Sequence, residues 1–134
     1  MKYLLDTNAW IEFLNKPNGV LATRVAKHAP HEIAANSVVI SELLVGCYKS
    51  SQQAANLALV QQILLQFMCL TFDETSADHY ARIRVHLESI GQPIGPHDTQ
   101  IAAIAKQHGL IVVTNNVSEF SRVPGLVVED WSIR

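Results

Sequence analysis

Short aliphatic runs that do not alternate with polar residues are the feature that most constrains this chain. The stretch from Leu110 to Val113 reads LIVV, which is typical of a strand covered on both faces. Segments with helical spacing of apolar residues separate one run from the next. Strands that alternate with helices in this way predict an α/β fold with a parallel sheet between two layers of helices. The runs expected as strands are Lys2 to Leu5, His31 to Asn36, Met68 to Phe72, Leu110 to Val113 and Leu126 to Val128.

Helices are expected in the segments between these strands. Ser37 is predicted to cap one of them, and Gly91 and Gly109 are predicted to follow the ends of two others. The segment from Gln52 to Gln66 is apolar on more than one side, which indicates an interior helix or a subunit contact. The expected helices lie around Trp10 to Leu14, at Val20 to Lys27, after Ser37, and at Gln52 to Gln66, Asp73 to Ile90 and His97 to His108.

Length and cysteine usage predict one domain over residues 1–134, with a core large enough to need no disulfide. Cys47 and Cys69 are isolated within apolar runs, so both are expected to be buried thiols in a reducing compartment. Asp6 interrupts the first apolar run, and no segment has the length of a membrane span. These features predict a cytoplasmic protein that does not bind a membrane.

The formal net charge of −2 gives no overall basic surface of the kind that indicates nucleic-acid binding. A nuclease is not excluded, because a metal site built from carboxylates lowers the formal charge and the bound cations raise it again.

Four acidic residues lie in apolar surroundings, where carboxylates are unusual. Asp6 follows a strand, Glu42 is the one charge in VVISELLVGC, Asp98 lies in the first turn of an apolar helix, and Glu119 follows the VV of the fourth strand. Such residues at the ends of elements can converge on the crevice at the carboxyl edge of a parallel sheet. Carboxylates that converge stay ionised when a divalent cation lies among them. Oxygen ligands without thiolates favour Mg²⁺ or Mn²⁺ over zinc.

Each acid also has a structural interpretation. Asp6 is suited to capping the helix that follows it, and Asp98 to a favourable position near the positive end of a helix dipole. Glu119 alone is an ordinary loop charge, whereas a charge such as Glu42 in an apolar helix needs a partner. The metal-site prediction therefore depends on the set of four.

Other catalytic motifs are missing from the sequence. There is no HExxH, no GxSxG and no Walker loop, and His79 and His86 have no third ligand nearby. A phosphatase of the haloacid-dehalogenase type also begins with a strand that ends in Asp, but it generally needs a second Asp two residues later, where this chain has Asn8.

With these residues in place, the sequence resembles the PIN-domain ribonucleases, and among them the VapC-type toxins of bacterial toxin–antitoxin pairs. Five stretches carry the resemblance in the family's order: LLDTN from Leu4, SVVISELLVG from Ser37, IGPHDTQIAAIA from Ile94, VVTNNVSEF from Val112 and RVPGLVVEDW from Arg122. The resemblance implies a three-layer α/β/α sandwich with a central, mostly parallel sheet. It also implies Mg²⁺-dependent endonucleolytic cleavage of RNA, with Mn²⁺ as a substitute.

The resemblance assigns roles to individual residues. Asp6, Glu42 and Asp98 match the family's three core acids, which are expected to hold one metal ion. The family usually has a fourth acid at the position of Asn116, so the resemblance leaves the fourth role to Glu119 or to Asn116, with Glu119 preferred. The expected supporting residues are Thr7, Asn8, Thr114, Asn115 and Asn116, and Phe120 is expected to anchor their loop. The candidate phosphate contacts are Arg82, Arg84, Lys106 and Arg122.

The resemblance further implies partners. They are a second copy of the chain in a homodimer, a VapB-type antitoxin that blocks the site within a larger complex, and operator DNA bound through the antitoxin. The expected substrate is tRNA, with the anticodon loop of initiator tRNA as the first hypothesis. The sequence leaves two alternatives open: a PIN-like binding module whose catalytic site has lapsed, and a haloacid-dehalogenase-like phosphatase.

Overall fold

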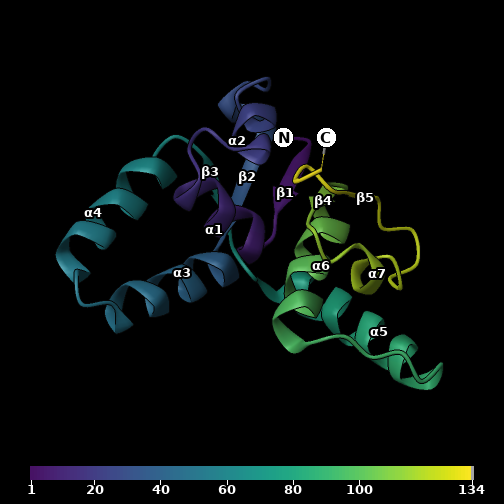
Figure 1. Ribbon diagram of the computed structural model, residues 1–134. Helices are drawn as coiled ribbons and strands as arrows, with labels where there is room; N and C mark the ends of the chain where they lie inside the picture. The colour runs from purple at the N-terminus through teal and green to yellow at the C-terminus, as the bar shows by residue number, and fades with distance from the viewer. Residues whose placement is uncertain (134) are drawn as a thin grey trace.

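The computed structural model describes residues 1–133 and contains one central sheet between layers of helices (Figure 1). The sheet has the strand order β3-β2-β1-β4-β5, and all neighbouring strands are parallel. The predicted α/β/α fold with a parallel sheet is therefore confirmed. The strands are β1 (Tyr3–Leu5), β2 (Ile33–Asn36), β3 (Met68–Leu70), β4 (Ile111–Val113) and β5 (Val128–Glu129).

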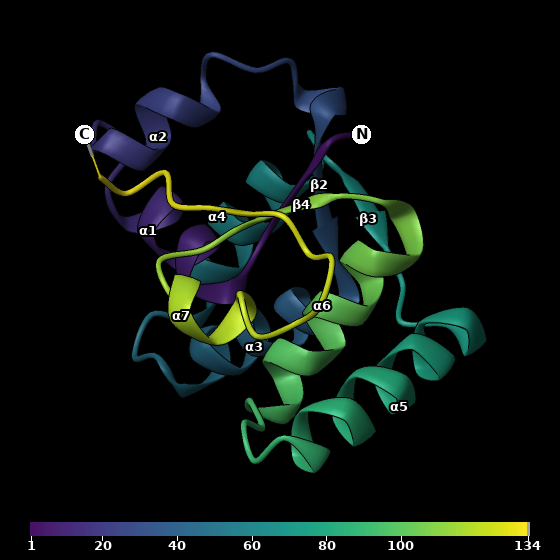
Figure 2. The same ribbon diagram turned by 90° about the vertical axis from the view of Figure 1, so that its right-hand side faces the viewer.

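The helices form two groups. In Figure 1, α1 to α4 lie on one side of the sheet and α5 and α6 on the other, and Figure 2 shows α5 running alongside α6. No helix among the described residues is long and apolar enough to traverse a bilayer. The helices are α1 (Thr7–Asn15), α2 (Val20–Val25), the 3₁₀ turn η1 (Pro30–Glu32), α3 (Ser37–Lys49), α4 (Gln53–Leu64), α5 (Glu74–Ser89), α6 (Pro96–His108) and α7 (Val117–Phe120).

The core explains the aliphatic composition of the strands. Leu4, Leu5, Val112 and Val113 are fully buried, because helices cover both faces of the two central strands. Five consecutive residues of α6, Ile101 to Ala105, are also fully buried. This packing fixes the start of α6, and with it Asp98, at the carboxyl edge of the sheet.

Two sequence predictions were wrong in detail. The N-cap of α3 is Asn36 and not Ser37: the Asn36 side chain accepts a hydrogen bond from the backbone N–H of Val39 at 2.9 Å. The Ser37 hydroxyl instead accepts the backbone N–H of Phe72 at 3.1 Å and so connects α3 to the chain after β3. Cys69 is exposed, because it lies on the edge strand β3, whereas Cys47 is buried as predicted.

Helix α4 is not an interior helix. Val60 is its one buried residue, while Leu59 and Leu65 are exposed. The second interpretation of its double-sided apolar composition, a contact with another subunit, stays a prediction.

Candidate active site

The site lies where the order of the strands in the sheet reverses. After β1 the chain adds β2 and then β3 on one side, and it returns to place β4 on the other side of β1. β1 and β4 stay paired to their carboxyl ends, and the segments that follow them, α1 and α7, lie on different sides of the sheet (Figure 1). Open α/β sheets usually bind ligands at such a place, and we call the carboxyl edge of β1 and β4 the crevice. Asp6 follows β1 and Thr114 follows β4. The Thr114 hydroxyl donates a hydrogen bond to Oδ2 of Asp6 at 2.5 Å.

Asp6 is buried, with 3% of its surface exposed. Its Oδ1 accepts the backbone N–H of Ala9 at 2.9 Å, so the residue also caps α1. Burial raises the pKa of Asp6 to about 6, against the lowering effect of the hydrogen bonds from Thr114 and Ala9, and the charges of Asp98 and Glu42 raise it further. The Asp6 side chain thus caps α1 and also lies near other carboxylates.

Glu42 lies on the second turn of α3 and is half-buried. Its Oε1 accepts a hydrogen bond from the Thr7 hydroxyl at 2.8 Å, and Nδ1 of His97 lies 3.3 Å from the same oxygen. These contacts supply the partner that the sequence required for a charge in an apolar helix. They also connect the starts of α1 and α6 to α3.

Asp98, Asn116 and Glu119 form the other side of the crevice. The Asn116 side-chain amide donates to Oε2 of Glu119 at 2.9 Å and to Oδ2 of Asp98 at 3.4 Å. Burial raises the pKa of Asp98, and the charge of Glu119 raises it further, while the Asn116 hydrogen bond lowers it. Asn116 thus connects two acids that repel one another.

The loop after β4 holds these groups in place. The backbone N–H of Asn116 donates to the Thr114 hydroxyl oxygen at 2.8 Å, so Thr114 contacts Asp6 and the Asn116 backbone together. Phe120 is fully buried, which confirms its predicted role as the anchor of this loop. A continuous set of hydrogen bonds therefore runs from Asp6 through Thr114 and Asn116 to Asp98 and Glu119.

Other predicted residues lie apart from this set. Asn8 and Asn115 are exposed and border a separate small depression, together with Glu12 and Ser132. No side-chain hydrogen bond from Asn8 to Asp6 is present among the described residues. The supporting role expected for Asn8 and Asn115 is thus not seen in these contacts.

The four candidate phosphate contacts are dispersed. Nε of Arg82 pairs with Asp78 at 2.9 Å and Nε of Arg84 pairs with Glu88 at 2.6 Å, both within α5. Arg122 donates to the backbone carbonyl of Pro93 at 3.0 Å. Lys106 borders a groove beside the turn that precedes β5. These residues do not form a continuous basic patch at the crevice.

His97 is a site residue that the sequence did not reveal. It is adjacent to Asp98, but neighbouring positions in a helix point in different directions, and the contact with Glu42 depends on how α3 and α6 pack. Asn36 was also missed: it is fully buried, and its Nδ2 has no hydrogen-bond partner among the described residues. The sequence signal that could have identified Asn36 is an asparagine at the end of an apolar strand, directly before a helix.

The donor set fits a hard divalent cation. Its acids provide carboxylate oxygens and no thiolate, as Mg²⁺ and Mn²⁺ prefer. Burial, and after it the repulsion between the acids, raises the pKa of Asp6 and Asp98, and a cation would stabilise the charged form of both carboxyl groups. Within residues 1–133, no three acidic, histidine or cysteine side chains already stand close enough together to hold a metal ion.

Comparisons with known proteins agree with this geometry. The family model of the PIN domain matches residues 3–126. The tRNA(fMet)-specific endonuclease VapC of Shigella flexneri is 39% identical over 133 residues, which are 98% of this chain and 99% of the relative. Its namesake from Salmonella typhimurium is 37% identical and covers 98% of both chains.

Solved structures give the same result. The DNA-bound VapBC of Salmonella typhimurium superposes with a TM-score of 0.92 at 36% identity and covers 98% of both chains. VapBC2 of Rickettsia felis, bound to a DNA fragment from its promoter, has a TM-score of 0.90 at 32% identity, over 98% of this chain and 99% of that one. The family model and these full-length similarities show that the chain belongs to the PIN-domain family, among the VapC ribonucleases.

Proposed function

We propose that this chain is an endoribonuclease and the toxin of a VapBC-type pair, and that it hydrolyses RNA with Mg²⁺, for which Mn²⁺ can substitute. The observation that carries the proposal is the convergence of Asp6, Glu42, Asp98 and Glu119 on the crevice between β1 and β4. VapC ribonucleases match the chain over its full length, which supports the same activity.

The residues of the crevice have separable roles in this proposal. Asp6, Glu42 and Asp98 would hold the cation, which when bound supplies Lewis-acid activation of the phosphoryl group. Thr114 orients Asp6 through its hydroxyl, and Thr7 orients Glu42. Asn116 fixes Glu119 beside Asp98, so Glu119 is the preferred fourth acid. Asn116 is its positioning residue.

We propose initiator tRNA as the substrate, cut in its anticodon loop. The support is the name of two relatives, tRNA(fMet)-specific endonuclease. An unpaired loop also suits a crevice at a sheet edge, because proteins recognise RNA sequence mainly where bases are unstacked and accessible.

The proposed partner is a VapB-type antitoxin that occludes the crevice. The solved relatives are VapBC complexes, two of them bound to DNA. We therefore propose that operator DNA is bound by the toxin–antitoxin complex through the antitoxin. We also propose that the toxin is a homodimer, for which light scattering of the purified chain is the direct measurement.

One assay tests the activity. Purified protein, free of antitoxin, is incubated with total RNA and with a small phosphomonoester, each with Mg²⁺ and with EDTA. Discrete RNA fragments that disappear in EDTA are the expected result. No turnover of either substrate would instead indicate a binding module whose site has lapsed, and phosphate release from the small substrate would indicate a phosphatase.

A further inference from the structure

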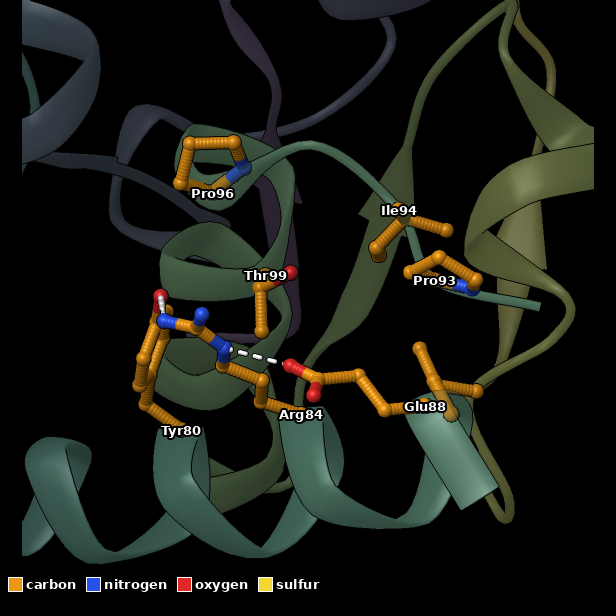
Figure 3. A pocket seen from close by; sticks show the side chains of 8 residues that line it. Tyr80, Arg84, Glu88, Pro93, Ile94, Pro96 and Thr99 are labelled. Atoms are coloured by element: carbon orange, nitrogen blue, oxygen red, sulfur yellow. Dashed lines mark hydrogen bonds and ion pairs between the residues drawn. The ribbon is translucent and has the colours of Figure 1, made fainter. Parts of the chain in front are cut away.

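A cavity of about 280 Å³ lies between α5 and the start of α6, outside the set of acids (Figure 3). Leu87 and Thr99 in its lining are buried, and Ile94 is half-buried. Sites for drug-sized ligands span roughly 300–1,000 Å³, so this cavity suits one flat ring system. It is lined by Tyr80, Arg84, Leu87, Glu88, Pro93, Ile94, Pro96 and Thr99.

The polar rim of the cavity consists of an exposed ion pair on α5 and carries no net charge. Arg84 donates from Nε to Glu88 at 2.6 Å and from a terminal nitrogen to the Tyr80 hydroxyl at 3.4 Å (Figure 3). These bonds hold the guanidinium as a flat plate at the edge of the cavity. The carboxylate of Glu88 opposes a phosphate at this place, since like charges repel. An uncharged planar ligand that both donates and accepts hydrogen bonds fits better.

The cavity is connected to the candidate active site through two elements. Pro96 and Thr99 belong to the first turn of α6, which also carries Asp98. Pro96 and Asp98 are two positions apart, or about 3 Å of helix rise. The Pro93 carbonyl accepts a hydrogen bond from Arg122, which closely follows the helix that carries Glu119. At 3.6 residues per turn, positions 96 and 98 lie about 200° apart around the helix axis. The cavity and the crevice therefore lie on different faces of the start of α6, and an RNA strand bound at Asp98 reaches the cavity by passing around this start.

We propose that this cavity binds one unpaired nucleobase of the RNA substrate, close to the bond that is cut. The inference depends on the proposed ribonuclease function and adds a subsite to it. Proteins bind unpaired bases by stacking them on aromatic rings or guanidinium planes and by bonding their edges. Arg84 provides the plane and a donor edge, Glu88 an acceptor, and Ile94 with the prolines an apolar wall.

This assignment changes the role predicted for Arg84 from the sequence. A phosphate contact would be a free cation, whereas Arg84 is paired. Recognition of a base gives affinity that does not depend on net positive charge, which suits a chain with a net charge of −2.

The test is cleavage kinetics on short RNAs that span a mapped cleavage site. One RNA is intact, and four others each lack the base at one of the two positions on either side of the scissile bond. Arg84→Ala is expected to raise KM for intact RNA by about fivefold or more, as loss of a stacked base does. One abasic RNA should show the same increase with the wild-type protein, and on that RNA Arg84→Ala should add less than twofold.

Two further variants distinguish recognition of a base from a general effect of positive charge on RNA binding. Arg82→Ala removes the same charge from another exposed ion pair on α5, the pair with Asp78, and Arg82 lines no part of this cavity. Any effect of this variant should therefore be equal for intact and abasic RNA. Ile94→Trp fills the cavity without changing charge and should raise KM for intact RNA alone. The slope of log KM against log salt should stay the same in Arg84→Ala, whereas loss of a phosphate contact reduces it by about 0.7.

Three results would overturn the inference. The first is an increase in KM for Arg84→Ala that is equal on all five RNAs, which would mean that Arg84 contributes only its positive charge. The second is unchanged RNA kinetics in Arg84→Ala and Ile94→Trp with weaker binding of the antitoxin, which would assign the cavity to the protein partner. The third is an absence of cleavage by the wild-type protein with Mg²⁺, and this result alone would also overturn the proposed function.

Discussion

Two buried side chains cap helices at the same edge of the sheet, and they differ in one functional group. Asp6 follows β1 and caps α1, and Asn36 follows β2 and caps α3. Both have extended backbones, and each side-chain oxygen accepts the N–H three residues later at 2.9 Å. Asparagine and aspartate cap helices about equally well. A negative charge at position 6 is therefore not needed for the helix.

The surroundings of the second side-chain atom explain the difference. Oδ2 of Asp6 accepts the Thr114 hydroxyl and lies in the field of Asp98 and Glu42. Nδ2 of Asn36 has no hydrogen-bond partner among residues 1–133. The charge of Asp6 costs stability, since burial and its neighbours raise its pKa to about 6. We therefore assign the charge to the chemistry of the crevice and the oxygen to the cap.

The largest expected effect is that of Asp6→Asn on cleavage. The substitution keeps the capping oxygen, as Asn36 does for α3, and removes the charge that holds the cation. Several kcal/mol of transition-state stabilisation is about a thousandfold in rate. We expect a loss of that order with Mg²⁺, while the melting temperature in EDTA stays equal or rises. Gel assays measure cleavage and thermal unfolding measures the melting temperature. If Asp6→Asn lowered both, the charge of Asp6 would have a structural role.

The second effect is the pH dependence of stability in EDTA. The pKa of Asp6 is about 6 in the folded protein, against an ordinary value of 3.8 for aspartate, so the folded state holds the proton more tightly. Protonation of Asp6 therefore stabilises the folded protein fully below pH 4, and this stabilisation is lost as the pH rises through 6. We expect the free energy of unfolding to fall by up to about 3 kcal/mol over this range. Denaturant unfolding of wild type and Asp6→Asn isolates the contribution, and parallel curves would contradict it.

The third effect tests the other cap. Asn36→Asp keeps the oxygen that accepts the Val39 N–H but places a charge at a fully buried position. We expect a loss of about 2 kcal/mol at pH 7 that shrinks at pH 5, where the new carboxyl takes up a proton. Chemical denaturation at the two pH values checks this. A variant as stable as wild type at pH 7 would mean that this edge of the sheet tolerates a carboxylate at either cap.

The fourth effect concerns the hydroxyl that distinguishes the two caps. Thr114→Val removes the hydrogen bond to Asp6 and the acceptor of the Asn116 N–H. We expect a loss of about 1 kcal/mol and a further rise in the pKa of Asp6, because its charged form loses a donor. An NMR titration of the Asp6 carboxyl measures that pKa, and an unchanged midpoint would show that Thr114 does not support the charge.

The fifth effect separates Glu119 from Asn116. Glu119→Ala removes a charge that raises the pKa of Asp98. We expect this variant to bind Mn²⁺ about tenfold more weakly, because one charge-assisted contact is lost. Asn116→Ala leaves both acids and should weaken Mn²⁺ binding less. Titration calorimetry of the two variants gives the comparison. If Glu119→Ala bound Mn²⁺ as tightly as wild type and Asn116→Ala bound it much more weakly, Asn116 and not Glu119 would be the fourth residue of the metal site.

Much of the fold and part of the candidate site could be predicted from the sequence. The aliphatic runs located the sheet because both of its faces are covered, and Asp6, Glu42 and Asp98 were identifiable because a carboxylate in apolar sequence is unusual. Strand ends and caps were less predictable: Ser37 and Asn36 are both good capping residues, and the choice between them depends on where β2 ends.

Contacts across the crevice could not be predicted. His97 contacts Glu42 only because α3 and α6 pack against each other, and spacing within one helix does not encode this. Arg84 looked like a free cation, although its pairing with Glu88 was available as a spacing of four residues along a helix. Its position over a cavity depends on the path of the Pro93 to Pro96 loop, which no local pattern specifies.

The most direct test of the central claim is to measure Mn²⁺ binding and RNA cleavage together in wild type and Asp6→Asn. Electron paramagnetic resonance reports free Mn²⁺ in the same samples that are assayed for cleavage. We predict saturable binding by the wild-type protein that follows the appearance of RNA fragments, and loss of both in the folded Asp6→Asn variant. Equal Mn²⁺ binding and equal cleavage by the two proteins, or undiminished wild-type cleavage in EDTA, would contradict the account.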